Sequence, residues 1–295
     1  MSKILVTGAY GFVGSRLCPK LEELGHKVDK VRHDRCDLRN LSSITYNYTD
    51  EGQYDKIYHL ACDTRAGDWC LTHAGNQWLN NQLINTNVLE FWTKYNPTAE
   101  LIAIGTSCSY DQNLYTNEAN YLSGEPHCTL YTYAMTKRML YIGLKSISSQ
   151  YNQKFMYLIP PTLYGPGFTD KDHHFVFDLI RKFHHAKLTN TSAEVWGDGL
   201  QQRQLLYIDD FIDELITTKS TNTIKNIGNN ENISLINFSE TLAKVIGLPI
   251  DKIYYNCKAF MGMKTNAIVS SLDRYYTPLD YGLKETYKYY LETLK

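Results

Sequence analysis

The feature that most constrains this chain is the glycine turn in "VTGAYGFVG", residues 6–14, which lies between an apolar run and an amphipathic segment. Ile4 to Val6 predicts a buried strand, the pattern from about Phe12 to Leu24 predicts a helix, and Val28 to Val31 predicts a second strand. The glycine spacing, G-x-x-G-x-x-G, differs from the common G-x-G-x-x-G fingerprint but meets the same needs: a tight turn, close approach of the backbone to a pyrophosphate, and a helix N-terminus facing the phosphates. The residues expected to contact a dinucleotide here are Gly8, Gly11, Phe12, Val13 and Gly14.

The segment after the second predicted strand bears on the choice of cofactor. A carboxylate at the end of that strand accepts the adenosine 2′-hydroxyl of NAD, whereas an arginine accommodates the 2′-phosphate of NADP. Arg32 holds this position and Arg35 follows, which favours NADP(H) over NAD(H). A register shift of two residues would place Asp34 there instead and favour NAD(H). Asp37 and Leu38 are expected beside the adenine ring.

Two further apolar runs, Lys56 to Ala61 and Leu101 to Ile104, predict strands of the same sheet. Leu60 and Ala61 end the first of them, where a cofactor would cross the sheet edge, and the helical stretch that follows contains Asn81, another expected cofactor contact. The second run stops at Gly105. The hydroxyl and thiol groups of residues 106–109 therefore gather at the carboxyl end of a strand, where open α/β sheets bind their ligands.

A tyrosine and a lysine lie four positions apart in "LYTYAMTKRML", residues 130–140. Positions i and i+4 share a helix face, so the phenol of Tyr133 and the ammonium of Lys137 are expected to point into one pocket. Tyr131 lies six positions from the lysine, on another face, and is not the partner. A neighbouring ammonium lowers the pKa of a phenol from about 10 toward neutrality, which suits proton transfer. The spacing is common in a chain with 24 tyrosines, so its meaning depends on the other motifs.

Charge and cysteine content exclude several classes of protein. Lys and Arg (30) nearly balance Asp and Glu (31), for a net charge of −1, so no polyanion-binding surface of the kind that nucleic-acid proteins carry is indicated. Seven scattered cysteines without a C-x-x-C pair predict a reducing, cytoplasmic setting and no metal site. The first apolar run is too short for a signal peptide, and no stretch approaches the roughly 18 apolar residues of a membrane span.

Together these motifs resemble the extended short-chain dehydrogenase/reductase family, also described as NAD-dependent epimerases and dehydratases, over about residues 3–250. That family builds its catalytic set from a strand-end serine and the Tyr-x-x-x-Lys pair, here Ser107, Tyr133 and Lys137. "IPPTLYGPG", residues 159–167, resembles the strand and loop that close the substrate side, with Pro160 beside the cofactor. "AEVWGDGLQQRQLLYIDDFID", residues 193–213, resembles the family's nucleotide-sugar signature. It offers Trp196 and Arg203 as substrate contacts, the arginine for the diphosphate.

The resemblance implies an α/β fold. A doubly wound parallel sheet (Rossmann) is expected over residues 1–163 with about 204–228, and a smaller mixed α/β substrate domain over 164–203 and 229–295. Family members usually dimerise by packing the tyrosine-bearing helix and its neighbour into a four-helix interface. "MLYIGLKSI" is apolar enough for that role, so a homodimer is expected.

Two segments point to the GDP-L-fucose synthases within this family. "GTSCSY" resembles their G-S-S-C-x-Y, which implies an epimerisation role for Cys108. "HHFVFDLIRKFHHA", residues 173–186, resembles one of their helices, which would align His174 with the second epimerisation residue and Arg181 with a substrate contact. The chain departs from the subgroup in three places. Thr106 replaces a serine, Phe177 replaces a proline, and "RAGDWCLTHAGNQW", residues 65–78, replaces a glycine-rich stretch that lines the sugar, which leaves the sugar's identity open.

The chemistry implied by this resemblance is epimerisation followed by reduction. A 4-keto group makes the protons on C3 and C5 acidic; Cys108 as a thiolate would remove one, and His174 would return a proton on the opposite face. NADPH would then deliver hydride to C4, Tyr133 would protonate the oxygen, and Ser107 would hydrogen-bond it. Lys137 would hold the nicotinamide ribose. The expected substrate is a GDP-linked 4-keto-6-deoxy sugar.

Several other functions are compatible with parts of the pattern. A 4,6-dehydratase would carry Thr-Asp-Glu where this chain has residues 106–108, and a 4-epimerase would keep NAD bound, against which Arg32 weighs. A 4-keto reductase of a hexose or heptose, without epimerisation, is the main enzymatic alternative. A non-catalytic NADP(H)-binding sensor on the same fold is the alternative from another class, although such proteins usually lose the tyrosine or the lysine.

Overall fold

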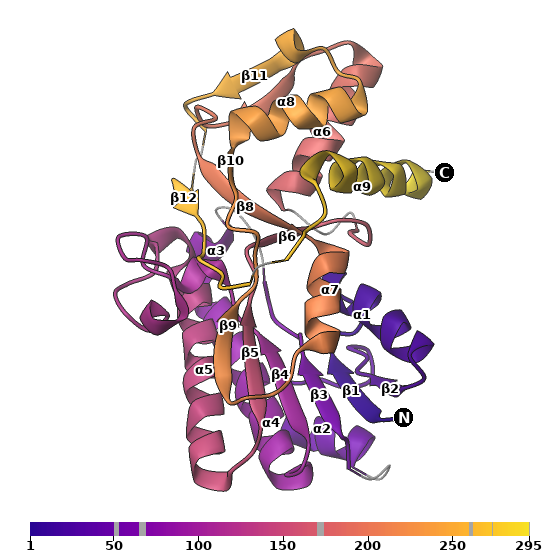
Figure 1. Cartoon of the computed structure of the whole chain (residues 1–295), viewed down its shortest axis with the longest axis vertical. Coiled ribbons are helices and arrows are strands. Elements are labelled where there is room, and N and C mark those ends of the chain that lie inside the picture. The colour runs from indigo at the N-terminus through magenta and orange to yellow at the C-terminus, as the bar shows by residue number, and fades with distance from the viewer. Residues whose placement is uncertain (50–52, 65–68, 170–173, 260–261, 273, 295) are drawn as a thin grey trace.

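The structure is a computed structural model that describes residues 1–49, 53–64, 69–169, 174–259, 262–272 and 274–294. Its lower part in Figure 1 is built on a six-stranded parallel sheet with the order β2-β1-β3-β4-β5-β9. Because the order reverses between β1 and β3, their carboxyl ends border the crevice in which sheets of this kind bind ligands. The strands are β1 Lys3–Thr7, β2 Lys27–Lys30, β3 Lys56–His59, β4 Glu100–Ile104, β5 Phe155–Ile159 and β9 Thr223–Asn226.

Helices cover both faces of this sheet, and alternate strand residues supply both cores. Leu101 and Ala103 of β4 belong to the core under α2 (Leu41–Tyr48), α4 (Ala74–Tyr95) and α5 (Tyr131–Tyr151). Ile102 between them belongs to the core under α1 (Phe12–Glu23) and α7 (Ile208–Thr217). Successive side chains on a strand point to opposite faces, so a strand buried on both sides reads as a continuous apolar run. The predicted doubly wound sheet is confirmed.

The upper part of the molecule in Figure 1 combines short strands with the helices α6, α8 and α9. One sheet has the order β10-β8-β12, with β6 also paired to β8, and a second sheet pairs β11 with β7. The strands are β6 Thr162–Tyr164, β7 Ala193–Trp196, β8 Gln202–Tyr207, β10 Asn232–Ser234, β11 Ile253–Asn256 and β12 Thr265–Asn266. Its helices are α6 Phe175–Thr189, α8 Leu235–Ile246 and α9 Leu279–Thr293. The remaining helical elements of the described chain are short: α3 Trp69–Thr72 and the 3-10 turns η1 Ser107–Ser109, η2 Glu118–Asn120, η3 Cys128–Leu130 and η4 Ile250–Lys252.

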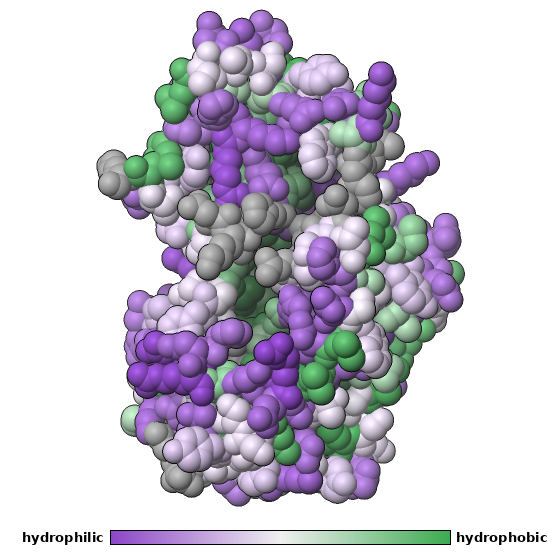
Figure 2. Space-filling view, turned by 180° about the vertical axis from the view of Figure 1, so that it is seen from behind, coloured by the Kyte–Doolittle hydropathy of each residue, from purple (hydrophilic) through white to green (hydrophobic). Residues whose placement is uncertain are grey.

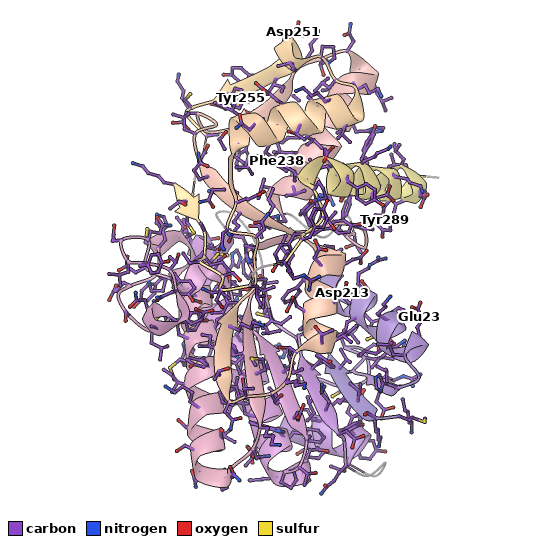
Figure 3. All side chains as sticks on the ribbon, viewed as in Figure 1. Glu23, Asp213, Phe238, Asp251, Tyr255 and Tyr289 are labelled. Atoms are coloured by element: carbon purple, nitrogen blue, oxygen red, sulfur yellow. The ribbon has the colours of Figure 1, made fainter. Side chains whose placement is uncertain are left out.

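Aromatic rings fill the upper core and join it to the start of α1. Phe238 of α8, labelled in Figure 3, lies 5.4 Å from Phe175 between ring centroids. Phe168 stacks on Phe177 of α6, with ring centroids 4.2 Å apart. Phe12 also contacts Phe177, edge to face, with ring centroids 5.4 Å apart. The first residue of α1 therefore packs against the helix that follows His174.

Figure 2 shows a hollow between the lower and upper parts, with hydrophobic residues on its floor. Within the described ranges, no helix has the length and apolarity needed to cross a membrane.

Several predicted element boundaries shift by one or two residues, and two of these shifts have identifiable reasons. β3 ends at His59, two residues before the predicted end, because the amides of Leu60 and Ala61 turn to the hydroxyl of Thr7 at 3.1 and 3.2 Å. α6 begins at Phe175, so His174 is its N-cap, in an extended conformation, and not a residue of its first turn. Residues 65–68 of the predicted sugar-lining stretch lie outside the described residues.

Candidate active site

The glycine turn lies against the loop after β3, at the carboxyl ends of β1 and β3. Gly8 has a φ of +67°, and a Cβ there would lie 2.7 Å from the amide nitrogen of Ala61. A Cβ on Gly14 would lie 2.2 Å from the carbonyl oxygen of Gly8. Gly11 is different, since its added Cβ would meet only that same oxygen, at an ordinary 3.4 Å. Gly8 and Gly14 therefore serve the packing of the turn, and Gly11 forms its open side.

The open side of the turn fits the pyrophosphate of a dinucleotide. α1 begins after Gly11 with no side-chain cap and no acidic residue in its first turn. The first amides of a helix lack partners within the helix, and its dipole favours an anion at this end. Phe12 and Val13 turn their side chains into the apolar cores, so only their backbone remains to face a phosphate.

Arg32 does not end β2, which is a correction to the predicted register. The strand stops at Lys30, and the guanidinium of Arg32 donates to the Asp34 carboxylate at 2.8 and 3.1 Å. Both side chains are exposed, and Arg35 follows them in the same exposed loop. Arg32, which favours NADP(H), and Asp34, which favours NAD(H), are therefore paired with each other. A 2′-phosphate would compete with Asp34 for the Arg32 guanidinium.

Asp37 and Leu38, the residues expected beside the adenine ring, both make contacts within the protein. Asp37 accepts hydrogen bonds from the guanidinium of Arg39 at 2.9 Å, and the carbonyl oxygen of Leu38 accepts from Asn87 of α4 at 3.0 Å. The Leu38 side chain is half-buried against the core under α4.

A buried histidine at the end of β3 was not anticipated from the sequence. The hydroxyl oxygen of Thr7 accepts from the amides of Leu60 and Ala61, so its hydrogen is directed to Nδ1 of His59 at 2.9 Å. Nε2 of His59 then carries the proton and donates to Oδ1 of Asn85 at 3.0 Å. This network locks the ring as the neutral Nε2–H form and ties β1, β3 and α4 together under the crevice.

Burial lowers the pKa of His59 to about 4, from 6.5; the charge of Lys137 acts in the same direction, and the hydrogen bond to Asn85 opposes it. The unfolded chain takes up a proton near pH 6.5 that the folded chain refuses until about pH 4, so stability is lost as the pH falls through this window. We expect His59 to cost about 2 kcal/mol of unfolding free energy between pH 7.5 and 5.0. Urea unfolding at both pH values, with His59→Gln as the reference, measures this loss. An equal loss in the two proteins would contradict the prediction.

Both polar atoms of the Asn81 side chain form hydrogen bonds, most of them with the loop after β3. Its Oδ1 accepts from the amide of Asp63 at 2.8 Å and from the thiol of Cys62 at 3.1 Å. Its Nδ2 donates to the carbonyl oxygens of Asp63 and Gln77, both at 2.9 Å. Asn81 is 1% exposed, so it shapes the crevice wall next to Leu60 and Ala61 and has no free polar atom for a cofactor.

Ser107 and Cys108 form the 3-10 turn η1 directly after β4. Thr106, which replaces a serine of the related subgroup, caps this turn by accepting from the amide of Cys108 at 3.2 Å. The amide of Ser107 donates to the carbonyl oxygen of Pro160 at 3.3 Å, which links η1 to the segment after β5. The hydroxyl of Ser109 donates to the carbonyl oxygen of Ala134 on α5 at 3.1 Å. The turn is thereby held against the helix that carries Tyr133.

Tyr133 and Lys137 share a face of α5 as predicted, with the Lys137 ammonium 5.9 Å from the centroid of the tyrosine ring. The predicted electrostatic effect is wrong. Lys137 donates to the carbonyl oxygen of Ile104 at 2.8 Å, and burial raises the pKa of Tyr133, helped by Cys62 and Cys108 and opposed by the hydroxyls of Thr64 and Thr106. The phenol is therefore held protonated, as a proton donor must be.

Cys108 and Arg203 interact electrostatically. Burial lowers the pKa of Arg203, a half-buried residue of β8, and the charge of the Cys108 sulfur acts in the opposite direction. Arg203 is held in place by donating to the carbonyl oxygens of Gln202 and Met263 at 2.8 and 2.9 Å. The structure thus brings together Tyr133, Lys137, Cys108 and Arg203 at the carboxyl end of β4, with Cys62 as a further thiol that the sequence reading did not assign to the site.

The other expected substrate residues lie on the upper part. The His174 ring lies 5.0 Å from that of Phe175 and 6.1 Å from that of Phe177. Arg181 donates to Asp178 at 3.0 Å and to the carbonyl oxygen of Thr169 at 2.7 Å, so its guanidinium is held within its own helix and the preceding loop. Trp196 is 49% exposed at the end of β7.

No group of three His, Cys, Asp or Glu side chains within the described ranges is arranged to hold a metal ion.

The chain is similar to known proteins in sequence and in fold. The model of the NAD dependent epimerase/dehydratase family matches residues 4–228. The GDP-L-fucose synthase of Dictyostelium discoideum is 25% identical over 98% of this chain and 95% of its own length. The solved structure of a GDP-L-fucose synthetase from Naegleria fowleri superposes with a TM-score of 0.87 at 21% identity, covering 99% of this chain and 94% of that one. A GDP-mannoheptose C4 reductase from Campylobacter jejuni with NADP bound gives 0.86 at 22% identity, covering 98% of each chain.

Proposed function

The chain belongs to the NAD dependent epimerase/dehydratase family, and from this membership we propose that it is an NADPH-dependent epimerase and reductase of a GDP-linked 4-keto sugar. The observation that carries the proposal is the meeting of a protonated phenol, Tyr133, with the Cys108 thiol and the Arg203 cation at one strand end. The relatives named GDP-L-fucose synthase and GDP-L-colitose synthase support the GDP-sugar class.

The cofactor residues are those around the glycine turn and the two loops beside it. NADPH, when bound, supplies the hydride for reduction of the C4 carbonyl. The amides at the start of α1 would hold its pyrophosphate, and Lys137 would hold the nicotinamide ribose. Arg32 and Arg35 would bind the 2′-phosphate. Asp37, Leu38, Leu60, Ala61, Asn81 and Pro160 complete the wall of the crevice.

Reduction needs a proton at the sugar oxygen, and Tyr133 provides it. The O–H bond of the phenol breaks as the proton passes to the C4 oxygen, and Ser107 donates a hydrogen bond to the same oxygen while its charge develops. The raised pKa of Tyr133 keeps the phenol loaded before each turnover.

Epimerisation assigns Cys108 as the base and His174 as the acid. The thiolate takes the proton from a carbon next to the carbonyl, the electron pair passes into an enolate, and the histidine returns a proton on the other face. Arg203 stabilises the thiolate through its charge. His174 lies at the amino end of α6 beside Phe177, which in turn packs on Phe12.

The nucleotide end of the substrate would bind to the upper part. Arg203 would contact the diphosphate, and Arg181 and Trp196 would be further contacts. Residues 1–163 with about 204–228 then serve the cofactor, and residues 164–203 with 229–295 serve the nucleotide sugar. For Arg181 to take part, the substrate must replace its present bonds to Asp178 and Thr169.

A cytoplasmic homodimer formed through α4 and α5 fits the exposed apolar residues on this pair of packed helices. Leu79 and Leu83 of α4 are 53% and 46% exposed, and Met139 and Ile142 of α5 are 45% and 40% exposed. All seven cysteines are free thiols, in keeping with a reducing compartment.

Solvent deuterium separates epimerisation from simple reduction. In D₂O with NADPH and a GDP-linked 4-keto-6-deoxy sugar, we expect cofactor oxidation and deuterium at C3 and C5 of the product. Cys108→Ser is expected to slow deuterium entry about a hundredfold, because a serine is a far weaker base at neutral pH. Cys128→Ser, an exposed thiol, is the matched control.

The outcomes distinguish the alternatives. NADPH oxidation without deuterium at C3 or C5 would favour a 4-keto reductase of a hexose or heptose. No oxidation with any 4-keto nucleotide sugar would favour a non-catalytic sensor. Deuterium entry at the wild-type rate in Cys108→Ser would remove that residue from the mechanism.

Arg32→Ala is expected to raise the KM for NADPH about tenfold and to leave the KM for NADH nearly unchanged, because only NADPH carries the 2′-phosphate. Steady-state kinetics with both cofactors measure this ratio. Equal changes in the two KM values would show that Arg32 acts through the loop fold and not through the phosphate.

A further inference from the structure

Arg138 of α5 is buried next to Lys137, and the function proposed above gives it no role. It is 4% exposed. All three nitrogen atoms of its guanidinium donate to main-chain carbonyl oxygens: Nε to Ser109 at 2.9 Å, and the two terminal nitrogens to Gly124 at 2.7 Å and Ser123 at 2.9 Å. A charged side chain is rarely buried unless its donors are bonded, and here the bonds go to the backbone of two different segments.

Arg138 and Lys137 hold the two ends of the segment that carries Cys108. Lys137 donates to the carbonyl oxygen of Ile104, the last residue of β4, at 2.8 Å. Arg138 donates to the carbonyl oxygen of Ser109, the last residue of η1. The side chains of neighbouring helix residues point in different directions, so these two cations can reach both ends of the segment. Residues 104–109 are thereby clamped against α5.

Ser109 is attached to α5 at a second point. It is 0% exposed, and its hydroxyl donates to the carbonyl oxygen of Ala134 at 3.1 Å. Ala134 and Arg138 lie four positions apart, one turn of the helix that also carries Tyr133. Because Cys108 directly precedes Ser109, these two bonds fix the place of the proposed base relative to the proposed proton donor.

The other two carbonyls that Arg138 engages belong to residues 123–124, at the far end of the loop that begins after Ser109. Gly124 has a φ of +59°, and an added Cβ would lie 2.2 Å from Oδ2 of Asp111, near the start of the same loop. The loop therefore leaves from and returns to one guanidinium. A planar guanidinium can bridge two such segments, whereas the ammonium of a lysine is a compact charge on a flexible stem.

We propose that Arg138 is a positioning residue for epimerisation, whose guanidinium holds the end of η1 and so places Cys108 for proton removal. This inference rests on the proposed function, in which Cys108 is the base. A displacement of about 1 Å between reacting groups can cost about a hundredfold in rate, so a loosened turn would slow proton removal strongly. The glycine turn that serves the cofactor lies on other elements and should not respond.

The test measures deuterium entry at C3 and C5 in D₂O, with NADPH and a GDP-linked 4-keto-6-deoxy sugar. Arg138→Lys keeps the charge and loses the fork, and Arg138→Gln keeps an amide donor without the charge. Both are expected to slow deuterium entry at least about tenfold per folded molecule while the Kd for NADPH stays at the wild-type value. Leu144→Ala is the control for lost stability, since it opens the core on the same helix; it should lower the Tm and keep the wild-type rate of deuterium entry.

A double-mutant cycle shows whether Arg138 acts through Cys108. In a Cys108→Ser background, Arg138→Lys is expected to slow the residual deuterium entry little, because the base whose position it disturbs is already absent. A general loss of structure would slow deuterium entry by the same factor in both backgrounds. Ser109→Ala removes the second tie by deleting one hydroxyl. It is expected to slow deuterium entry as well, and it provides a test that does not depend on the folding of the Arg138 variants.

Three results would overturn the inference: wild-type deuterium entry in a folded Arg138→Lys or Arg138→Gln protein, equal slowing with and without Cys108, or wild-type deuterium entry in Ser109→Ala. Failure of the proposed function looks different. In that case the wild-type protein would incorporate no deuterium, or Cys108→Ser alone would incorporate it at the wild-type rate, and the inference would fall with it.

Discussion

Tyr133→Phe is expected to lower kcat for NADPH-dependent reduction about a thousandfold, while the KM for NADPH changes little. Phenylalanine keeps the ring that Lys137 faces at 5.9 Å but has no proton to give to the sugar oxygen. General acid catalysis by a positioned side chain contributes about 10²–10⁴-fold, which sets the size of the loss. Stopped-flow measurement of NADPH oxidation at saturating sugar gives the rate of the reductive step directly.

Tyr131→Phe is the matched control, because the same chemical change is made two residues earlier, on a side chain that is 39% exposed. It should retain the wild-type rate. If Tyr133→Phe kept more than about a tenth of the activity, the proton would have to come from another group, and Ser107 would be the first to examine.

Gly14→Ala is expected to destabilise the protein by more than about 3 kcal/mol, or to prevent folding. The added Cβ would lie 2.2 Å from the carbonyl oxygen of Gly8 and 2.6 Å from the Cα of Ala9, and both are backbone atoms that cannot rotate away. The turn and the start of α1 would have to separate. Urea unfolding of the protein without cofactor measures the loss independently of any effect on binding.

Gly11→Ala in the same turn provides the comparison. Its added Cβ meets only the Gly8 oxygen at 3.4 Å, and its φ of −81° suits any residue. The midpoint of unfolding should stay close to that of the wild type. Similar destabilisation by the two substitutions would mean that the turn depends on glycine flexibility and not on the close packing described here.

The features of the fold that depend on local sequence patterns were predictable. The apolar runs of β1, β4 and the glycine turn predicted a parallel sheet with a cofactor crevice, and the i, i+4 spacing placed Tyr133 and Lys137 on one helix face. The resemblance to the epimerase/dehydratase family is confirmed as well. Each of these inferences depends on residues close together in sequence, where periodicity carries the information.

The electrostatics and the long-range contacts could not be read in the same way. His59 acquires its role only when Thr7 and Asn85 meet it from β1 and α4. The Tyr133 pKa was predicted to fall because the sequence shows the nearby lysine but neither the burial of the phenol nor the carbonyl oxygen of Ile104 that engages the ammonium. Charge and desolvation depend on three-dimensional surroundings, which one-dimensional spacing does not contain.

The contact between Phe12 and Phe177 links events at the two ends of the reaction. Phe12 follows directly on Gly11, where the pyrophosphate is proposed to sit, and Phe177 lies within the first turn of the helix that His174 caps. A movement of the first turn of α1 would therefore be passed by direct ring contact to the first turn of α6, next to His174. The turn proposed for the cofactor and the start of the helix after His174 are thus coupled through one edge-to-face pair of rings.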